Sequence, residues 1–328
     1  MRIAVSGSIA TDHLMVFPGS FTDQLIQDRL DKISLSFLVD DLEIRHGGVA
    51  ANISYGLGGL GQDPVLVGAA GSDFAEYRTR LKEQGVDTDF VHISSERQTA
   101  RFMCLTDREE HQIASFYSGA MAEAAGIDLQ QVVERAGDVG AVVISPNDPA
   151  AMLRHTDQAR SMGIAFAADP SQQLARLDRD EARHLVTGAR WLFTNEYEAS
   201  LLQERTGWRR ADILSRAGVW LTTLGERGVR MEAAGEPVRE VPAVPPAGIA
   251  DPTGAGDAFR AGFMAAVSWG EGLEPAARVG CAVASFSLEA LGAQGYALEP
   301  AALLQRLEDS YGVTSARAIA PHLQRGRR

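Results

Sequence analysis

The stretch that decides the fold reads Asp251-Pro252-Thr253-Gly254-Ala255-Gly256-Asp257-Ala258-Phe259-Arg260-Ala261-Gly262-Phe263. Pro252 favours a non-helical backbone just before the glycines. Phe259, Phe263 and Val267 then recur every four residues, and this spacing predicts one buried face of a helix. The small residues from Gly254 to Gly256 are therefore expected at the start of that helix.

These three small residues, Gly254, Ala255 and Gly256, predict a cradle for an anion. The first backbone N–H groups of a helix have no intrahelical partner, and the helix dipole adds positive potential there. Small side chains let a phosphate group approach that backbone closely. Asp257 beside the cradle has two interpretations, a helix cap or a general base. An anion cradle with a carboxylate to accept a hydroxyl proton suits phosphoryl transfer to an alcohol, so we favour the second interpretation.

Short β-branched runs alternate with helical patterns along most of the 328 residues. This alternation predicts an α/β fold, with a central, mainly parallel sheet covered by helices. Apolar runs such as Ala-Val-Val-Ile fit parallel strands that are buried on both faces. The predicted strands are Ile3–Val5, Val65–Val67, Ala141–Ile144, Ile164–Ala168, Trp191–Thr194 and Val219–Thr222, and the predicted helices include Pro149–Ser161 and Glu196–Thr206.

Two regions, at about 12–46 and 92–118, contain extended segments without helices between them. We interpret them as a small β-sheet lid on a single domain spanning 1–328, the alternative being edge strands of the main sheet. Leu35, Phe37 and Val39 alternate with other residues and would expose an apolar face, so pairing of two lids in a homodimer is expected. Residues 312–328 are expected to form a C-terminal tail.

Composition excludes several classes of protein. The formal net charge is −12, from 43 acidic and 31 basic side chains, which argues against a nucleic-acid-binding protein. The only cysteines, Cys104 and Cys281, are far apart, so neither a disulfide framework nor a cysteine-based zinc site is expected. No apolar run suits a signal peptide or a membrane span. We expect a cytoplasmic protein without a membrane partner.

One glycine pattern is misleading. Gly56-Leu57-Gly58-Gly59-Leu60-Gly61 satisfies G-x-G-x-x-G, but the dinucleotide fingerprint follows a strand and opens a helix. Here the preceding residues have helical spacing and Val65–Val67 afterwards is a predicted strand. We expect these glycines to end a helix, and a dinucleotide-dependent oxidoreductase is disfavoured.

The stretch Asp251 to Asp257 resembles the C-terminal signature of the PfkB (ribokinase-like) family of carbohydrate and nucleoside kinases. Three further motifs resemble that family: Gly47-Gly48-Val49-Ala50-Ala51-Asn52 its G-G-x-x-x-N signature, Asn195-Glu196-Tyr197-Glu198 its N-x-x-E motif, and Thr223-Leu224-Gly225-Glu226-Arg227-Gly228 its T-x-G-x-x-G loop. The four motifs stand in the family's order and span nearly the whole chain. Pro252 departs from the family, where many members have Thr. The resemblance implies a ribokinase-like α/β/α sandwich with a β lid.

A narrower resemblance concerns the substrate. Ser6–Met15, Ser34–Leu42 and Ala168–Leu177 are similar to the mycobacterial-type bacterial adenosine kinases. Where ribokinases and fructokinases often carry D-P-N-x-R, this chain reads Asp169-Pro170-Ser171-Gln172-Gln173. This implies an adenosine kinase, which would transfer the γ-phosphoryl group of ATP to adenosine and release AMP and ADP. A PfkB-family sugar kinase and a nucleoside-binding protein without catalysis are the alternatives.

The resemblance implies substrate-binding residues. Asp12 and Asn52 would hydrogen-bond the ribose hydroxyls. Phe102 and Phe116 would sandwich the adenine, although aromatic residues in strands commonly belong to a core. Gly47 and Gly48 could also be no more than a turn, and Ser36 could face solvent. The full expected set is Ser8, Asp12, Ser36, Gly47, Gly48, Asn52, Phe102, Phe116, Gln172 and Gln173.

The resemblance also implies a nucleotide site with Mg²⁺ as cofactor. The expected ATP-binding residues are Asn195, Thr223, Gly225, Gly228 and Gly256. Glu198 would hold Mg²⁺ through water, because Mg²⁺ keeps much of its hydration; the alternative is a solvated helix residue. Asp251 would lie near an activating monovalent cation such as K⁺.

Overall fold

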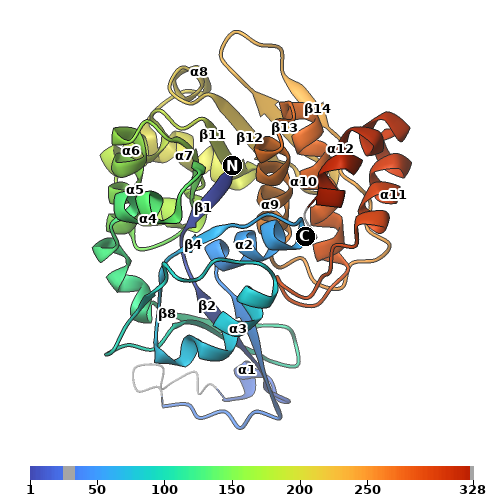
Figure 1. Cartoon of the computed structure of the whole chain (residues 1–328). Helices are drawn as coiled ribbons and strands as arrows, with labels where there is room; N and C mark the ends of the chain where they lie inside the picture. Colours follow the sequence, from blue (N-terminus) through green and yellow to red (C-terminus); the bar gives the residue numbers. More distant parts are fainter. Residues whose placement is uncertain (25–33, 326–328) are drawn as a thin grey trace.

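The computed structural model describes residues 1–24 and 34–325 (Figure 1). An eight-stranded sheet has the order β14-β13-β12-β11-β10-β9-β1-β4. Its strands from β4 to β12 in that order run parallel, whereas β13 and β14 are antiparallel additions at one edge. The strands are β1 (Arg2–Ser6), β4 (Val65–Val67), β9 (Val139–Ile144), β10 (Ala165–Ala168), β11 (Trp191–Asn195), β12 (Val219–Thr223), β13 (Val229–Glu232) and β14 (Arg239–Val241).

Helices cover both faces of this sheet, because its strands are apolar on both faces. In β9, Val143 packs into one core cluster, whereas Val142 and Ile144 pack into the other. The first cluster joins the sheet to α2 (Val49–Gly59), α3 (Ala75–Glu83), α9 (Ala255–Ser268), α10 (Leu273–Leu288), α11 (Pro300–Tyr311) and α12 (Val313–Arg325). The second joins it to α4 (Leu129–Ala136), α5 (Pro149–Ser161), α6 (Arg179–Val186), α7 (Glu196–Thr206) and α8 (Arg210–Leu214). The predicted α/β/α sandwich is confirmed.

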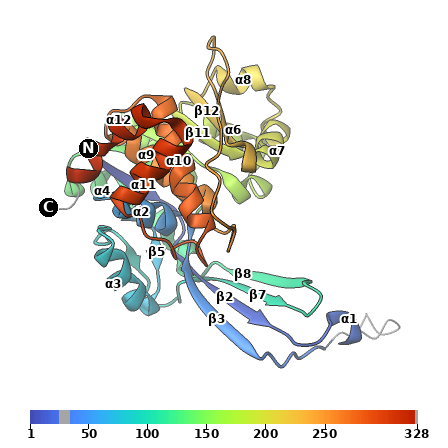
Figure 2. The same ribbon diagram turned by 90° about the vertical axis from the view of Figure 1, so that its right-hand side faces the viewer.

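A second sheet extends away from the sandwich, as Figure 2 shows. Its strands are β2 (Ala10–Val16), β3 (Asp41–Gly47), β7 (Ala100–Thr106) and β8 (Gln112–Tyr117), in the order β3-β2-β7-β8. They lie in the two regions expected to form the lid, so we call this sheet the lid. The short elements near it are α1 (Phe21–Gln24), β5 (Ala69–Ala70), β6 (His92–Ile93) and the 3-10 turns at Ser72–Phe74 and Gly119–Gly126. Two further 3-10 turns, Ser171–Ala175 and Gly225–Arg227, lie in the sandwich.

Residues 34–39, where alternation predicted a strand, are not part of one. Phe37 packs with its ring edge against Phe17, at 5.0 Å between ring centroids, and Val39 joins the same small cluster. Leu38 between them is exposed. The alternation therefore separates the partly buried Phe37 and Val39 from the exposed Leu38 without strand pairing, and Leu35 is itself exposed. Residues 25–33 of the predicted lid lie outside the described residues.

The C-terminal segment also differs from the expectation of a tail. Residues 313–325 form α12, and Ala316, Ile319 and Leu323 are buried in the core. His322 stacks on Trp269, with 5.1 Å between ring centroids. The spacing of these apolar residues is that of a helix face, and the basic residues at the end of the chain obscured it.

The glycine-rich stretch after Gly56 ends α2, as expected, and β4 follows. A side chain at Gly56 would place its Cβ 2.6 Å from the Cβ of Ala261, so this glycine lets α2 and α9 pack closely. In the part of the chain that the structure describes, no helix is both long and apolar enough to cross a membrane.

Candidate active site

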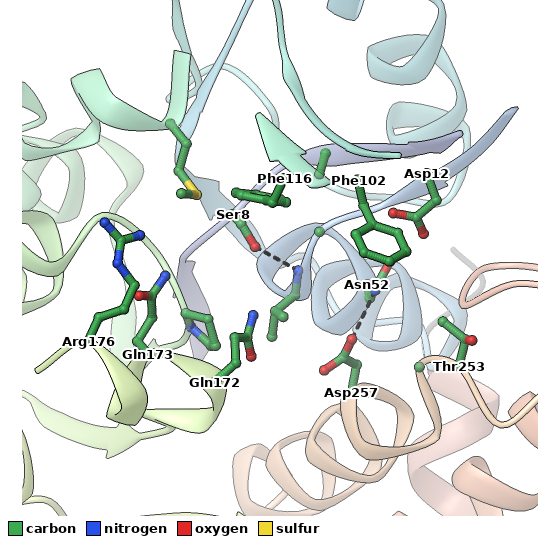
Figure 3. A pocket seen from close by; sticks show the side chains of 16 residues that line it. Ser8, Asp12, Asn52, Phe102, Phe116, Gln172, Gln173, Arg176, Thr253 and Asp257 are labelled. Atoms are coloured by element: carbon green, nitrogen blue, oxygen red, sulfur yellow. Dashed lines mark hydrogen bonds between the residues drawn. The ribbon is translucent and has the colours of Figure 1, made fainter. Parts of the chain in front are cut away.

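A pocket of about 520 Å³ lies where the carboxyl ends of the parallel strands, the lid and the start of α9 meet (Figure 3). Parallel sheets place the loops that follow their strands at one common edge, where ligands bind. Its lining residues are Ser8, Ala10, Asp12, Gly48, Val49, Asn52, Phe102, Phe116, Met121, Pro146, Gln172, Gln173, Arg176, Thr253, Gly254 and Asp257.

The floor of the pocket is the predicted anion cradle at the start of α9. Gly254 is the N-cap, with φ 81°, and a Cβ there would lie 2.4 Å from the Cβ of Ala293. Only glycine suits both the left-handed backbone and this close approach. Ala255 and Gly256 form the first turn, so their N–H groups have no intrahelical acceptor; that of Ala255 makes a long contact of 3.4 Å with the Pro252 carbonyl oxygen.

Asp257 is the third residue of α9, and the N-cap position is taken by Gly254. Oδ2 of Asp257 accepts a hydrogen bond of 2.9 Å from Nδ2 of Asn52. Asn52 Oδ1 in turn accepts one of 2.8 Å from Nε2 of Gln294. Burial raises the pKa of the Asp257 carboxyl, against the lowering effects of the Arg260 charge and the Asn52 hydrogen bond. Asp257 is thus held in one orientation facing the pocket.

A buried ion pair lies beneath the cradle, and sequence reasoning missed it. Nη2 of Arg260 donates to Oδ1 of Asp169 at 2.5 Å, and both side chains are almost fully buried. A Cβ on Gly256 would lie 2.8 Å from Nη1 of Arg260, so the guanidinium lies directly against the cradle. A permanent positive charge there adds to the attraction for a phosphate. The available signal was an arginine four residues after Gly256, on a helix otherwise rich in apolar residues.

The roof of the pocket is the lid. Phe102 of β7 pairs with Phe116 of β8, and Asp12 of β2 pairs with Phe102 on its other side. The exposed fractions of Phe102 and Phe116 are 36% and 51%, so neither ring is a core residue. Figure 3 shows both rings across the pocket from Asp257.

Burial raises the pKa of Asp12 to about 6, although the charge of Arg45 lowers it, and the carboxylates of Asp251 and Asp257 raise it further. Gly47, the cross-strand neighbour of Ala10, lies beside this carboxylate: a Cβ there would be 2.8 Å from Oδ2 of Asp12. A ligand in the pocket therefore meets an acidic group whose pKa lies well above the usual value for aspartate.

Of the other expected substrate residues, four line the pocket and Ser36 does not. Gly48 has φ 93°, and Ser8 Oγ accepts a hydrogen bond of 3.0 Å from the next residue's N–H, that of Val49. Gln172 and Gln173 line the opposite wall. Among the described residues, buried Oε1 of Gln173 has no hydrogen-bond partner and is an acceptor available to a ligand. Ser36 is exposed and does not line the pocket.

Apart from Gly256 in the cradle, the expected nucleotide residues lie at or just after neighbouring strand ends, outside the lining of this pocket. Asn195 at the end of β11 pairs with Thr223 at the end of β12. Gly225 and Gly228 follow in a tight turn with φ values of 61° and 95°. A side chain at Gly225 would meet nothing within 4 Å, so the backbone here is open to a ligand.

Glu198 forms a capping box with Asn195, at 2.8 Å in each direction. Its Oε1 also accepts a 3.1 Å hydrogen bond from Ser171 Oγ, next to Gln172. The charge of Glu198 raises the pKa of both Asp169 and Asp257, although burial is the larger cause for each. A divalent cation would relieve this repulsion between carboxylates, so these residues fit Mg²⁺ held through water.

Asp251 does not fit the expected site for a monovalent cation. Its Oδ1 accepts a hydrogen bond of 2.9 Å from the Thr253 N–H. Its Oδ2 accepts one of 2.8 Å from Nη1 of Arg45 and one of 2.9 Å from the Gly292 N–H. An arginine thus lies where the cation would bind the carboxylate.

The model of the pfkB family of carbohydrate kinases matches residues 11–300. A nucleoside kinase of Methanothermobacter thermautotrophicus is 31% identical over 270 residues, covering 81% of this chain and 86% of that protein. A nucleoside kinase of Methanocaldococcus jannaschii is 28% identical over 251 residues, covering 76% of this chain and 81% of that protein. Both descriptions are broader than that of a mycobacterial-type adenosine kinase.

Solved structures agree with this result. Burkholderia thailandensis nucleoside kinase in complex with inosine superposes with a TM-score of 0.83 at 31% identity, covering 94% of this chain and 98% of that one. Thermotoga maritima ribokinase, at 19% identity, has the same fold, with a TM-score of 0.77 over 94% of this chain and 99% of that one. By its sequence motifs, its fold and the family match over residues 11–300, the chain belongs to the pfkB family of carbohydrate kinases.

Proposed function

We propose that this protein is an ATP-dependent nucleoside kinase, and that its substrate is adenosine, converted to AMP with release of ADP in purine salvage. The observation that carries the proposal is the pairing of Phe102 and Phe116 on the lid, across one pocket from Asp257 and the anion cradle. Two exposed phenyl rings suit a planar base, whereas a free sugar has no aromatic face to stack on them. The nucleoside kinases of two archaea and the inosine complex from Burkholderia thailandensis support this class.

In the proposed complex, the base lies between the rings and the ribose lies towards Asp12, Asn52 and the Gly47–Gly48 turn. The 5′-hydroxyl then points to Asp257. An alcohol is far too weak an acid for a carboxylate to ionise beforehand, so its proton passes to Asp257 as the O–P bond forms. The cradle and the Arg260 guanidinium stabilise the negative charge on the transferred phosphoryl group. Holding the 5′-hydroxyl in line with the γ-phosphorus supplies much of the remaining increase in rate.

ATP is assigned to the neighbouring strand ends, with Asn195, Thr223, Gly225 and Gly228 on the nucleotide and Gly256 at the transferred phosphate. Mg²⁺ would neutralise phosphate charge, and Glu198 would hold it through water. This division puts the two substrates on opposite sides of the start of α9. An ATP-using reaction also agrees with the cytoplasmic location expected from the sequence.

The proposal is tested by a coupled ADP-release assay with adenosine, inosine, other nucleosides, ribose and fructose as acceptors. We expect the highest kcat/KM with adenosine. A preference for ribose or fructose would identify a sugar kinase, an alternative favoured by the Bacillus subtilis ribokinase that is 27% identical to this chain. Nucleoside binding without ADP release would identify a binding protein.

Adenosine affinity is expected to weaken at acidic pH. The ionised carboxylate of Asp12 can accept from both ribose hydroxyls, whereas the protonated carboxyl keeps one good acceptor oxygen and loses the charge. The pKa of Asp12 in the free protein is about 6. Protonation therefore competes with binding below that pH, and the Kd should be about tenfold higher at about pH 5 than at about pH 7. Calorimetric titration with adenosine across this pH range measures the Kd. Asp12→Asn should bind more weakly with no such pH dependence, and a constant wild-type Kd would contradict the role of Asp12.

A homodimer formed through the lids is also proposed. Leu42 and Ile44 of β3 and Ile113 of β8 are about half exposed, at 52%, 58% and 50%, on the lid. Burying such side chains against a second lid would stabilise a dimer. Light scattering at high micromolar concentration should give the dimer mass, and Ile44→Glu should shift it to the monomer. A monomeric wild type would eliminate this proposal alone.

A further inference from the structure

Arg45 connects the lid to the loop that precedes the anion cradle. It lies on β3, and its Nη1 donates to Oδ2 of Asp251 at 2.8 Å across 206 positions of sequence. The side chains of Arg45 and Asp251 are only 19% and 13% exposed. Nε and Nη2 of Arg45 each donate to Glu43 at 2.7 Å, which fixes the plane of the guanidinium.

The other groups around Asp251 belong to the sandwich. The N–H of Gly292 donates to the same oxygen that Arg45 contacts, and a Cβ on Gly292 would lie 3.0 Å from Cδ of Arg45. The N–H of Thr253 donates to the second oxygen of Asp251, and both Thr253 and Gly254 line the pocket. The carboxylate of Asp251 is therefore hydrogen-bonded directly to the loop residue that precedes the cradle.

A monovalent cation bound to Asp251 would need the oxygens that these donors use. Arg45 already supplies one permanent positive charge, because a guanidinium does not lose its proton in a protein. That charge also acts on Asp12, which faces Arg45 across the strand pair and feels the carboxylates of Asp251 and Asp257. The arginine thus offers both the contact and the charge that a cation would bring.

We propose that Arg45 takes the place of a monovalent cation at Asp251, joining the lid to the cradle loop, so that this enzyme needs no K⁺. Arg45 is a positioning residue, since it acts on the phosphate only through Asp251 and the loop after it. The inference rests on the proposed kinase function for its kinetic readout, and on ion-dependent stability for a readout independent of activity.

The experiment compares wild type, Arg45→Ala and Arg45→Lys in KCl, NaCl and choline chloride at constant ionic strength. We expect wild-type kcat to be the same in all three salts. Arg45→Ala should lose kcat about 10- to 100-fold in choline, the effect of losing a charge-assisted hydrogen bond. KCl should restore much of that loss, because the cation can then reach Asp251, and Arg45→Lys should need less restoration. Melting temperatures in the same salts should rise with K⁺ only for Arg45→Ala.

The matched control is Arg101→Ala, which removes a lid arginine that pairs with Asp73 at 2.9 Å, away from Asp251. It should show neither the loss of kcat nor a response to K⁺. Activation of the wild type by K⁺ would overturn the proposal, as would an Arg45→Ala variant that does not respond to K⁺ in melting temperature. Absence of ADP release from the wild type with every acceptor would instead reject the kinase function, and the melting measurements would still decide the role of Arg45.

Discussion

Asp257→Asn is expected to lower kcat by roughly 10²–10⁴, the usual range for losing a general base. The carboxylate lies one turn into α9, beside the anion cradle, and faces the pocket. Asparagine has the same shape and can still accept the hydrogen bond from Asn52, so the pocket should keep its form. The amide cannot take up the hydroxyl proton. The Kd values for adenosine and ATP should therefore stay within a few-fold of the wild-type values, which titration calorimetry measures. The rate of phosphoryl transfer should fall by the range given above, which single-turnover kinetics measures.

The control for this experiment is Asp148→Asn, because Asp148 caps α5 and its Oδ1 accepts a hydrogen bond of 3.0 Å from the Ala150 N–H. That variant should lose some stability and no turnover. If Asp257→Asn behaved in the same way and kept about a quarter of the wild-type rate, far outside the expected range, the general-base role would be wrong.

Local sequence patterns were sufficient for much of the fold and for the pocket. Val65–Val67 and Pro149–Ser161 have the bounds expected from their apolar periodicity. The position of Gly254–Gly256 at the start of a helix could be predicted, because Pro252 precedes them and apolar residues recur every four positions after them. Four short motifs, distant in sequence, indicated the family and its fold, and the carboxyl ends of parallel strands place the side chains that follow them near one edge.

Pairings between distant side chains could not be read in this way. Arg260 contacts Asp169 across 91 positions, and no local periodicity relates the two. The ion pair of Arg45 with Asp251 could not be predicted for the same reason. Without it, Asp251 resembled an unpaired carboxylate that could bind a cation. Ser36 was placed in the pocket by resemblance alone. It is exposed, and its neighbour Phe37 packs with Phe17 and Phe21, which do not line the pocket.

The tail expectation failed because a strongly basic end to the chain looked solvated. The apolar face of α12 consists of the buried residues Ala316, Ile319 and Leu323, which are spaced three and four positions apart. Burying them against the first core cluster stabilises the helix, although its exposed face is polar. One helix can carry charged residues on its exposed face and apolar residues on its buried face, so the composition of the segment alone did not predict whether it packs on the core.

The substrate class depends most on the lid rings, and Phe102→Ala tests them. Stacking of a base on an aromatic ring contributes roughly 1–3 kcal/mol, so the variant should bind adenosine about 5- to 150-fold more weakly. ATP affinity should change little, because the residues assigned to its nucleotide lie at the ends of β11 and β12 and in the turn after β12, and they do not line this pocket. The melting temperature should also change little, since a ring that is 36% exposed leaves no closed cavity when it is removed.

A buried lid aromatic provides the contrast. Phe17 is 9% exposed and packs against Phe21 and Phe37, so Phe17→Ala should lower the melting temperature clearly. Its effects on the two substrates should be similar, because a loosened lid does not distinguish between them. The two variants thus distinguish a ring that stacks on the base of the substrate from a ring that stabilises the lid. If folded Phe102→Ala bound adenosine as tightly as the wild type, the base would have to lie elsewhere. The pocket would then fit a free sugar better, because the polar wall at Gln172 and Gln173 would remain and no stacking would be needed.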